Sequence, residues 1–206
     1  MTTKDVFAST VSRETIERLD HFEGLLRKWN PKINLISKND VDQIWQRHIL
    51  DSTQVFQHAV PPFQTWFDFG SGGGFPGIMC AVLAAERFPE AAFHMVESDI
   101  RKAVFLKQVA TELHLSAKVH SVRIEHLDAG SADVISARAL APLSELLKLS
   151  VPHAARHAQL LFPKGRNAET ELTHAHLSWN FEVDRIPSLT DPDALILRLT
   201  GVSARS

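Results

Sequence analysis

Cysteine and tyrosine are the scarce residues of this chain: its 206 residues include one cysteine and no tyrosine. A single cysteine excludes an intramolecular disulfide framework and a cysteine-based zinc cluster, and it is typical of a cytosolic protein. No apolar run approaches the length of a membrane span, and residues 1–20 lack the apolar core of a signal peptide. We therefore expect a cytoplasmic protein without a membrane partner.

An excess of charge of one sign is also missing. The chain has 22 Lys and Arg against 24 Asp and Glu, a formal net charge of −2. Any nucleic-acid binding therefore has to use local basic patches. The length suits one domain with an appendage, and the 44% hydrophobic content argues against wholesale disorder.

Residues 1–62 have a helical pattern. From Ser12 to Trp29 apolar residues recur every three or four positions, with Ser12 as N-cap, and Asn30-Pro31 is expected to end the helix. A second helix, with a break, is expected from residue 39 to Phe56. We expect these residues to form a helical cap.

From Thr65 onward, short apolar runs of strand character alternate with helical periods, which predicts an α/β fold. The last two runs are separated only by Pro187–Asp193, which suits a hairpin better than a crossover. We expect residues 63–206 to form one compact unit around about seven strands, mostly parallel, with the last strand antiparallel. The expected strands are 65–69, 92–97, 117–122, 133–137, 158–162, 179–186 and 194–199, and the expected helices are 76–87, 100–113, 142–150 and 167–176.

A glycine-rich loop, Asp68–Gly77, follows the first strand and opens a helix, as in nucleotide-binding folds. Glycine serves where φ is positive or where a ligand approaches the main chain. Pro76 suits the first helical turn. The next strand ends in Glu97, about twenty residues further on, where an acidic residue accepts hydrogen bonds from a ribose.

Two cofactors fit this loop. The spacing Gly72-x-Gly74-x-x-Gly77 satisfies the dinucleotide pattern and leaves an NAD-dependent oxidoreductase open. The spacing Asp68-x-Gly70-x-Gly72-x-Gly74 resembles the motif of S-adenosylmethionine-dependent methyltransferases. Oxidoreductases of this kind usually carry a Ser-Tyr-Lys constellation. This chain cannot form it, because it has no tyrosine.

Polar residues follow three further strands. Ile124 and Glu125 come after the third, where an adenine could lie, although solvated charges alone explain the pattern as well. Arg138, between small residues after the fourth strand, suits a ligand-facing position. Lys164, between Pro and Gly after the fifth, suits an anionic substrate.

Taken together, these residues resemble a known family, the bacterial small-subunit ribosomal RNA methyltransferases of the glucose-inhibited division protein B type, which modify a guanine at N7. The resemblance runs from about Arg27 to Leu199. Its most specific part precedes the glycine loop. The matching segments are Lys28-Trp29-Asn30, Asn34-Leu35, Arg47-His48-Ile49-Leu50-Asp51-Ser52, Asp68–Ile78, Arg101-Lys102, Phe105-Leu106, Ser136-Ala137-Arg138-Ala139 and Lys164-Gly165.

The resemblance implies a Rossmann-like class I methyltransferase sheet, S-adenosylmethionine as cofactor and 16S rRNA as partner, with methylation at N7 of the guanine at nucleotide 527. Gly73 departs from the family's usual Pro, and Ala137 shifts the alignment near Arg138 by one position. The resemblance places the family's cofactor contacts on Gly70, Phe75, Ile124, Glu125 and Arg138. With the other loop glycines and the acidic position included, the expected cofactor-binding residues are Gly70, Gly72, Gly74, Phe75, Glu97, Ile124, Glu125 and Arg138.

The chemistry of N7 needs little from the protein. Guanine N7 carries a free lone pair, so a direct displacement requires no general base and no covalent enzyme intermediate. The only cysteine, Cys80, has the pattern of a core residue, and the amino-methylation motif Asn/Asp-Pro-Pro-aromatic is absent after the fourth strand. We expect no obligatory catalytic residue, with Arg138 and Lys164 positioning the substrate.

RNA has to be bound by local cations, and the target base has to leave its stack to reach the methyl group. Trp29 and Trp45 lie at core spacing and are expected to pack. Arg47 and Lys164 are the residues for which we expect phosphate contact. The candidate RNA-binding residues are Lys28, Arg47, His48, Arg101, Lys164 and Arg166.

Other interpretations remain open. His153-x-x-x-His157 would share a face on a helix, but no acidic or cysteine partner accompanies the pair, so no metal site is expected. A methyltransferase of another RNA site or of a small molecule fits the sheet pattern, as does an inactive RNA-binding assembly factor. The default oligomeric state is a monomer.

Overall fold

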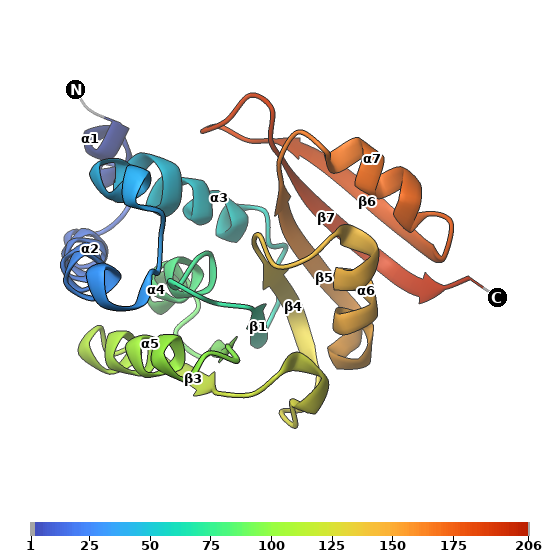
Figure 1. The fold of residues 1–206 in the computed structure, drawn as a ribbon, viewed down its shortest axis with the longest axis horizontal. Coiled ribbons are helices and arrows are strands. Elements are labelled where there is room, and N and C mark those ends of the chain that lie inside the picture. The colour runs from blue at the N-terminus through green and yellow to red at the C-terminus, as the bar shows by residue number, and fades with distance from the viewer. Residues whose placement is uncertain (1–2, 206) are drawn as a thin grey trace.

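The computed structural model describes residues 3–205 and contains one seven-stranded sheet in the order β3-β2-β1-β4-β5-β7-β6 (Figure 1). β1 to β5 run parallel, and β7 is antiparallel to both β5 and β6. The expected hairpin and the antiparallel last strand are confirmed. The strands are β1 (Thr65–Phe69), β2 (Ala92–Val96), β3 (Ala117–His120), β4 (Ala132–Ala137), β5 (Ala154–Lys164), β6 (Trp179–Pro187) and β7 (Leu195–Ala204).

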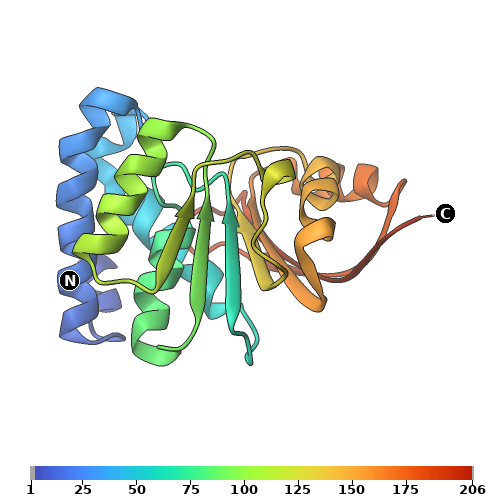
Figure 2. The same ribbon diagram turned by 90° about the horizontal axis from the view of Figure 1, so that it is seen from below.

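Helices cover both faces of the sheet, so the molecule has three layers (Figure 2). On one face α4 and α5 pack with the N-terminal helices against Trp66 and Phe93, and on the other α6 and α7 pack against Phe67 and Phe69. The α-helices are α1 (Thr3–Ala8), α2 (Arg13–Ile33), α3 (Asp51–Gln57), α4 (Gly77–Arg87), α5 (Ile100–Glu112), α6 (Leu143–Ser150) and α7 (Ala168–Ala175). The shorter helical segments are η1 (Lys38–Gln43), η2 (Trp45–Leu50), η3 (Ile124–His126) and η4 (Val151–His153).

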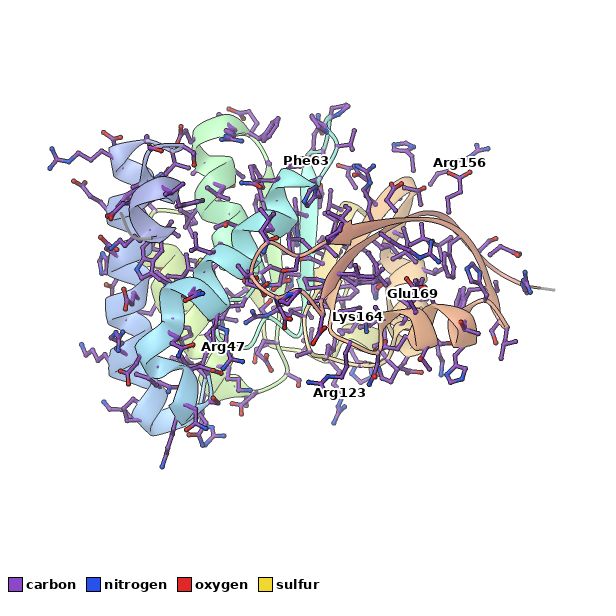
Figure 3. All side chains as sticks on the ribbon, turned by 90° about the horizontal axis from the view of Figure 1, so that it is seen from above. Arg47, Phe63, Arg123, Arg156, Lys164 and Glu169 are labelled. Atoms are coloured by element: carbon purple, nitrogen blue, oxygen red, sulfur yellow. The ribbon has the colours of Figure 1, made fainter. Side chains whose placement is uncertain are left out.

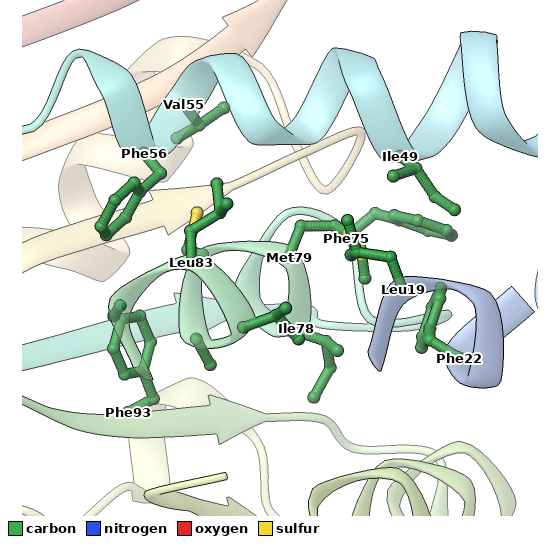
Figure 4. Packing of buried hydrophobic residues seen from close by; sticks show 14 of the residues in the cluster. Leu19, Phe22, Ile49, Val55, Phe56, Phe75, Ile78, Met79, Leu83 and Phe93 are labelled. Carbon is green, nitrogen blue, oxygen red and sulfur yellow. The ribbon is translucent and has the colours of Figure 1, made fainter. Parts of the chain in front are cut away.

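The N-terminal helices share a core with the sheet domain. α4 lies between α3 and the sheet, and Ile49, Val55 and Phe56 pack in the same cluster as Met79 and other α4 residues (Figure 4). The glycine loop that opens α4 is therefore held from the cap side as well as from the sheet.

The predicted end of the first helix at Asn30-Pro31 is wrong. α2 continues through Pro31 to Ile33 and ends where Asn34 takes a left-handed conformation at φ 50°. The buried Asn30 side chain makes this end favourable, because its Oδ1 accepts hydrogen bonds from the N–H groups of Leu35 (2.7 Å) and Ile36 (2.9 Å). An internal proline loses one helical hydrogen bond, which this cap and the burial of Ile33 offset.

Other bounds also differ from those predicted. β5 begins at Ala154, not at Ala158, because Ala154 pairs with Ala132 before the register shifts. β3 ends at His120, two residues early. The predicted break in the second helix is confirmed, since η1 is a 3-10 helix and η2 a π-helix. The predicted packing role of Trp29 is confirmed by its contact with Phe105 at 5.9 Å between ring centroids.

Candidate functional site

The site residues gather at one edge of the sheet. The parallel strands β1 to β5 end there, and the carboxyl edge of such a sheet is where ligands bind. In Figure 3, Arg47, Lys164 and Arg123 lie toward this edge, and Phe63 lies toward the opposite one.

The glycine loop takes a backbone conformation that other residues avoid. Gly70, Gly72 and Gly74 have φ of +64°, +52° and +93°. At Gly70 an added Cβ would meet Leu140 at 2.7 Å, and at Gly74 it would meet Ile78 at 2.9 Å. At Gly72 the nearest atom is a loop carbonyl at 3.5 Å. A side chain at Gly70 or Gly74 would therefore overlap its neighbours, whereas at Gly72 the positive φ is the main obstacle to another residue.

Glu97 follows β2 and orders the loop. Its Oε2 accepts the N–H of Gly72 at 2.9 Å, and its Oε1 accepts the N–H of Asp99 at 2.8 Å. The residue is 8% exposed. A carboxylate has about four acceptor positions, so Glu97 can also accept hydrogen bonds from two ribose hydroxyls.

Asp68 at the end of β1 places a carboxylate beneath the start of α4. A Cβ on Gly77 would meet Asp68 Oδ2 at 2.5 Å. Complete burial raises the pKa of Asp68 to about 6, although hydrogen bonds, first from Ser136, oppose the shift. Dinucleotides place a pyrophosphate at such a helix N-terminus, and here the buried Asp68 carboxyl lies beneath it. Pro76, expected inside the first turn, is the N-cap and has no N–H to offer.

Ile124 and Glu125 lie in η3, beyond the end of β3. Ile124 is buried in the same cluster as Val96 and Phe69, and its carbonyl oxygen lies 3.1 Å from His153 Nε2. Glu125 is exposed. Both residues therefore lie at the carboxyl edge, and their contact with a cofactor remains a prediction.

Arg138 points toward the cap. Its Nη1 donates to Asp51 Oδ2 at 3.1 Å, and its guanidinium carbon lies 5.0 Å from the centroid of the Phe75 ring. Phe75 also stacks on His48 and packs edge-on against Phe22. The side chains of Arg138 and Phe75 thus join the loop to the cap.

His48 is neutral at physiological pH. Burial and then the positive charge of Arg138 lower the pKa of His48 to about 4. Arg138 Nη2 lies 3.0 Å from His48 Nδ1. Because an arginine only donates, Nδ1 accepts and the ring proton is on Nε2, which faces Asp40 at 3.5 Å.

A cavity of about 720 Å³ opens beside these residues, within the range of about 300–1,000 Å³ typical of ligand sites. Leu140 lines the cavity and its side chain lies against Gly70, so the cavity adjoins the glycine loop through Leu140. The residues that line the cavity come from the cap, the loop after β4, the end of β5 and the β6–β7 loop. Its polar lining consists of Arg47, His48, Asp51, Arg138, Lys164, Glu171, Ser188, Thr190 and Asp191.

Lys164 lines the cavity but is only 9% exposed. Its ammonium donates to Glu171 Oε2 and to the carbonyl oxygen of Ala141, both at 2.8 Å. An ammonium has three N–H groups, so one remains for a ligand in the cavity.

The candidate RNA-binding residues divide by exposure. Lys28, Arg47, Arg101 and Arg166 are exposed, whereas His48 and Lys164 are mostly enclosed. Arg47 pairs with Asp40, and Arg101 pairs with Asp99 at 3.0 Å.

The two histidines considered for a metal do not share a helix. His153 ends η4 and His157 lies in β5, because the chain turns into a strand at Ala154. Within residues 3–205 no three His, Cys, Asp or Glu side chains converge on a metal site. No described helix is long and apolar enough to cross a membrane.

The sequence analysis overlooked several residues of the cavity. Asp51 stands in the Arg47–Ser52 segment that carries the resemblance, and this was the signal available for it. Glu171, Ser188 and Thr190 had no signal, because only the fold brings α7 and the β6–β7 loop to this edge.

The fold and site define the class of S-adenosylmethionine-dependent methyltransferases with a Rossmann-like sheet. A SAM dependent methyltransferase from Aquifex aeolicus matches with a TM-score of 0.59 over 79% of this chain and 94% of its own, at 13% identity. The plantazolicin methyltransferase BpumL in complex with SAH matches with a TM-score of 0.56 over 94% and 99%, at 14% identity. At these identities the likeness shows the fold.

The chain belongs to the family of ribosomal RNA small subunit methyltransferase G. The profile described as "GidB: rRNA small subunit methyltransferase G" matches residues 15–196. Ribosomal RNA small subunit methyltransferase G of Cereibacter sphaeroides is 52% identical over 193 residues, 94% of each chain. That of Ruegeria pomeroyi is 50% identical over 203 residues, 98% of this chain and 99% of its own. The predicted family and the predicted cofactor, S-adenosylmethionine, are confirmed.

The residues present fit this cofactor better than a dinucleotide. Glu97 retains acceptor capacity for a ribose, and the buried carboxyl of Asp68 beneath the start of α4 is an unfavourable neighbour for a phosphate group. The cofactor supplies an electrophilic methyl group on a sulfonium sulfur.

Proposed function

We propose that this protein transfers the methyl group of S-adenosylmethionine to N7 of a guanine in 16S rRNA, at nucleotide 527, by direct displacement. It acts as a cytoplasmic monomer with the cap, residues 1–62, facing the RNA. The cofactor contacts are Gly70, Gly72, Gly74, Phe75, Glu97, Ile124, Glu125 and Arg138.

The observation that carries the proposal is a cavity beside the glycine loop that, within residues 3–205, is lined by no cysteine and whose one histidine, His48, is engaged by Arg138. Cys80 is buried in α4, and burial raises the pKa of its thiol well above the usual value, so a cysteine-dependent attack on a pyrimidine is disfavoured. His48 has a pKa of about 4 and its acceptor nitrogen is engaged by Arg138. Asp51 and Glu171 are held in ion pairs.

Guanine N7 fits a site of this kind. Its lone pair attacks the methyl carbon while the sulfur takes the bonding pair, which yields a thioether and a cationic 7-methylguanine, and no proton leaves. The protein then contributes orientation and electrostatics.

Lys164 and Arg138 are the positioning residues. Guanine O6 is an acceptor next to N7, and the third N–H of Lys164 is available to it. Arg138, neutralised by Asp51, adds little repulsion to the positive charge that develops on the base. Exposed Lys28, Arg47, Arg101 and Arg166 contact phosphates around the cavity.

The test uses small ribosomal subunits from cells that lack this protein, with subunits from cells that contain it as the matched substrate control. Labelled S-adenosylmethionine is supplied, and the product is mapped by borohydride–aniline cleavage, which cuts at 7-methylguanine. One new cut at nucleotide 527, with incorporation only into subunits from the deficient cells, supports the proposal. Label without a cut refutes N7, and a cut elsewhere refutes the nucleotide.

A further inference from the structure

The loop between β6 and β7 holds an apolar side chain out in solvent. Leu189, at its tip, is 84% exposed, the highest value among the large apolar side chains of the described residues. A single exposed leucine is ordinary on a protein surface. What distinguishes this one is how its loop is held and where it stands.

A buried glutamine of the cap fixes the tip of the loop. Gln54 in α3 is 3% exposed, and its Oε1 accepts the N–H of Leu189 at 2.7 Å. Its Nε2 donates to Thr190 Oγ1 at 3.2 Å and lies 3.4 Å from Ser188 Oγ. All hydrogen-bonding groups of a buried amide are thus directed at three consecutive loop residues. Figure 1 shows this loop reaching over toward α3.

The loop is also joined to the site. Thr190 Oγ1 donates to Asp51 Oδ1 at 2.7 Å, and the other oxygen of Asp51 accepts from Arg138. Ser188, Thr190 and five further residues of the loop and of β7 line the cavity, and Arg47 lines it from the cap. Leu189 therefore projects from the rim of the cavity.

Pre-organisation of an apolar side chain at this place has a physical use. A base that reacts inside a pocket has to leave its stack, and this unstacking costs a few kcal/mol. Proteins that open base stacks insert apolar wedges such as Leu or Phe between bases. A wedge carried on a backbone that is fixed in advance loses little backbone conformational entropy on insertion.

We propose that Leu189 is such a wedge: it occupies the RNA stack that the target guanine vacates while the guanine lies in the cavity. The proposal rests on the proposed function and adds a specific substrate-contacting residue to it. The substrate class it requires is a base held in structured RNA, not a free nucleotide.

The test compares Leu189→Ser with Leu177→Ser. Leu177 is 74% exposed in the turn after α7 and does not line the cavity, so its variant controls for loss of surface apolarity. Small subunits lacking the modification are the substrate. Single-turnover methyl transfer is measured at saturating protein, together with subunit affinity, S-adenosylhomocysteine affinity and thermal midpoint.

We expect Leu189→Ser to slow the single-turnover rate at least tenfold, with the other three quantities close to wild type. Leu177→Ser should retain the full rate, and Leu189→Met should restore most of it because methionine keeps an apolar side chain of similar length. An unchanged rate for Leu189→Ser overturns the wedge, as does a loss confined to subunit affinity. Wild-type protein that transfers no methyl group refutes the proposed function itself and the wedge with it.

Discussion

Arg138 and Asp51 form an ion pair that connects the sheet to the cap, with Nη1 and Oδ2 3.1 Å apart. Arg138 follows β4 and Asp51 begins α3, 87 residues apart in the chain. His48, Phe75 and Thr190 surround the pair. The same two side chains therefore order the glycine loop, the cap and the β6–β7 loop around one cavity.

Removal of one partner of this pair should destabilise the fold. Asp51→Asn leaves Arg138 without its hydrogen-bonded counter-charge, and breaking a fully buried pair costs roughly 3–5 kcal/mol. The side chains here are 19% and 22% exposed, so we expect a loss of about 2 kcal/mol in the free energy of unfolding, measured with urea. Asp42→Asn, on the exposed surface of η1, is the control. Equal effects of the two variants would show that the ion pair contributes nothing to the free energy of unfolding.

His48 should make stability depend on pH. Its pKa of about 4 in the folded protein lies below the ordinary histidine pKa of 6.5, so the unfolded chain binds the proton first. The contribution of His48 to the free energy of unfolding is fully present above pH 6.5 and is lost as pH falls toward 4. Between pH 7.5 and pH 5 we expect the titration of His48 to lower the free energy of unfolding by about 2 kcal/mol.

The measurement is the difference in unfolding free energy between wild type and His48→Gln at both pH values. Glutamine retains an acceptor for Arg138 and has no titration, so the difference should shrink at pH 5. Exposed His157→Gln should follow the wild type. A difference that is independent of pH would contradict the lowered pKa.

Ser136 holds a buried polar network together. Its Oγ accepts from Trp66 Nε1 at 2.9 Å and donates to Asp68 Oδ1 at 2.6 Å. Ser136→Ala leaves both partners unsatisfied in the core, which should cost about 2–4 kcal/mol of unfolding free energy. Exposed Ser131→Ala should be neutral in the same denaturation. A loss below about 1 kcal/mol would mean that the network contributes little.

Alanine substitutions at Gly72 and Gly130 distinguish the effect of backbone strain from the effect of lost cofactor contact. Gly72 and Gly130 both have positive φ, +52° and +78°, and neither has a neighbour that an added methyl group would overlap. Alanine at either position should cost about 1–2 kcal/mol of stability. Only Gly72→Ala should weaken S-adenosylmethionine binding, by tenfold or more in calorimetry. Equal cofactor affinity in the two variants would remove Gly72 from the binding site.

The sequence predicts phosphate contact for both Arg47 and Lys164, but the enclosed position of Lys164 should make the two act differently on RNA. Exposed Arg47, replaced by Ala, should weaken subunit binding and lower the slope of log affinity against log salt by about 1. Lys164→Ala should leave the slope unchanged and slow methyl transfer, because Lys164 is 9% exposed and paired with Glu171. Exposed Arg13→Ala, on α2, is the control for a lost surface charge. A lower slope for Lys164→Ala would instead assign it to phosphate.

Local pattern was sufficient for most of the architecture. Strand–helix alternation and the short Pro187–Asp193 connection predicted the parallel sheet and its hairpin, because periodicity and loop length are properties of the chain itself. The helix end at Pro31 was mispredicted, since its stability depends on the Asn30 side chain and on burial of Ile33. Such contacts are not visible in periodicity.

The sequence by itself determined the family, the cofactor and the strand ends that carry Glu97, Arg138 and Lys164, because motif spacing along the chain reflects a fixed geometry of each strand–loop unit. Only the tertiary structure decided what those side chains do. It paired Arg138 with Asp51 and Lys164 with Glu171, and it brought Thr190 to the same cavity. Charges distant in the chain meet only when the sheet and cap pack together, and burial then determines which of them keep a proton, a partner or a free hydrogen bond.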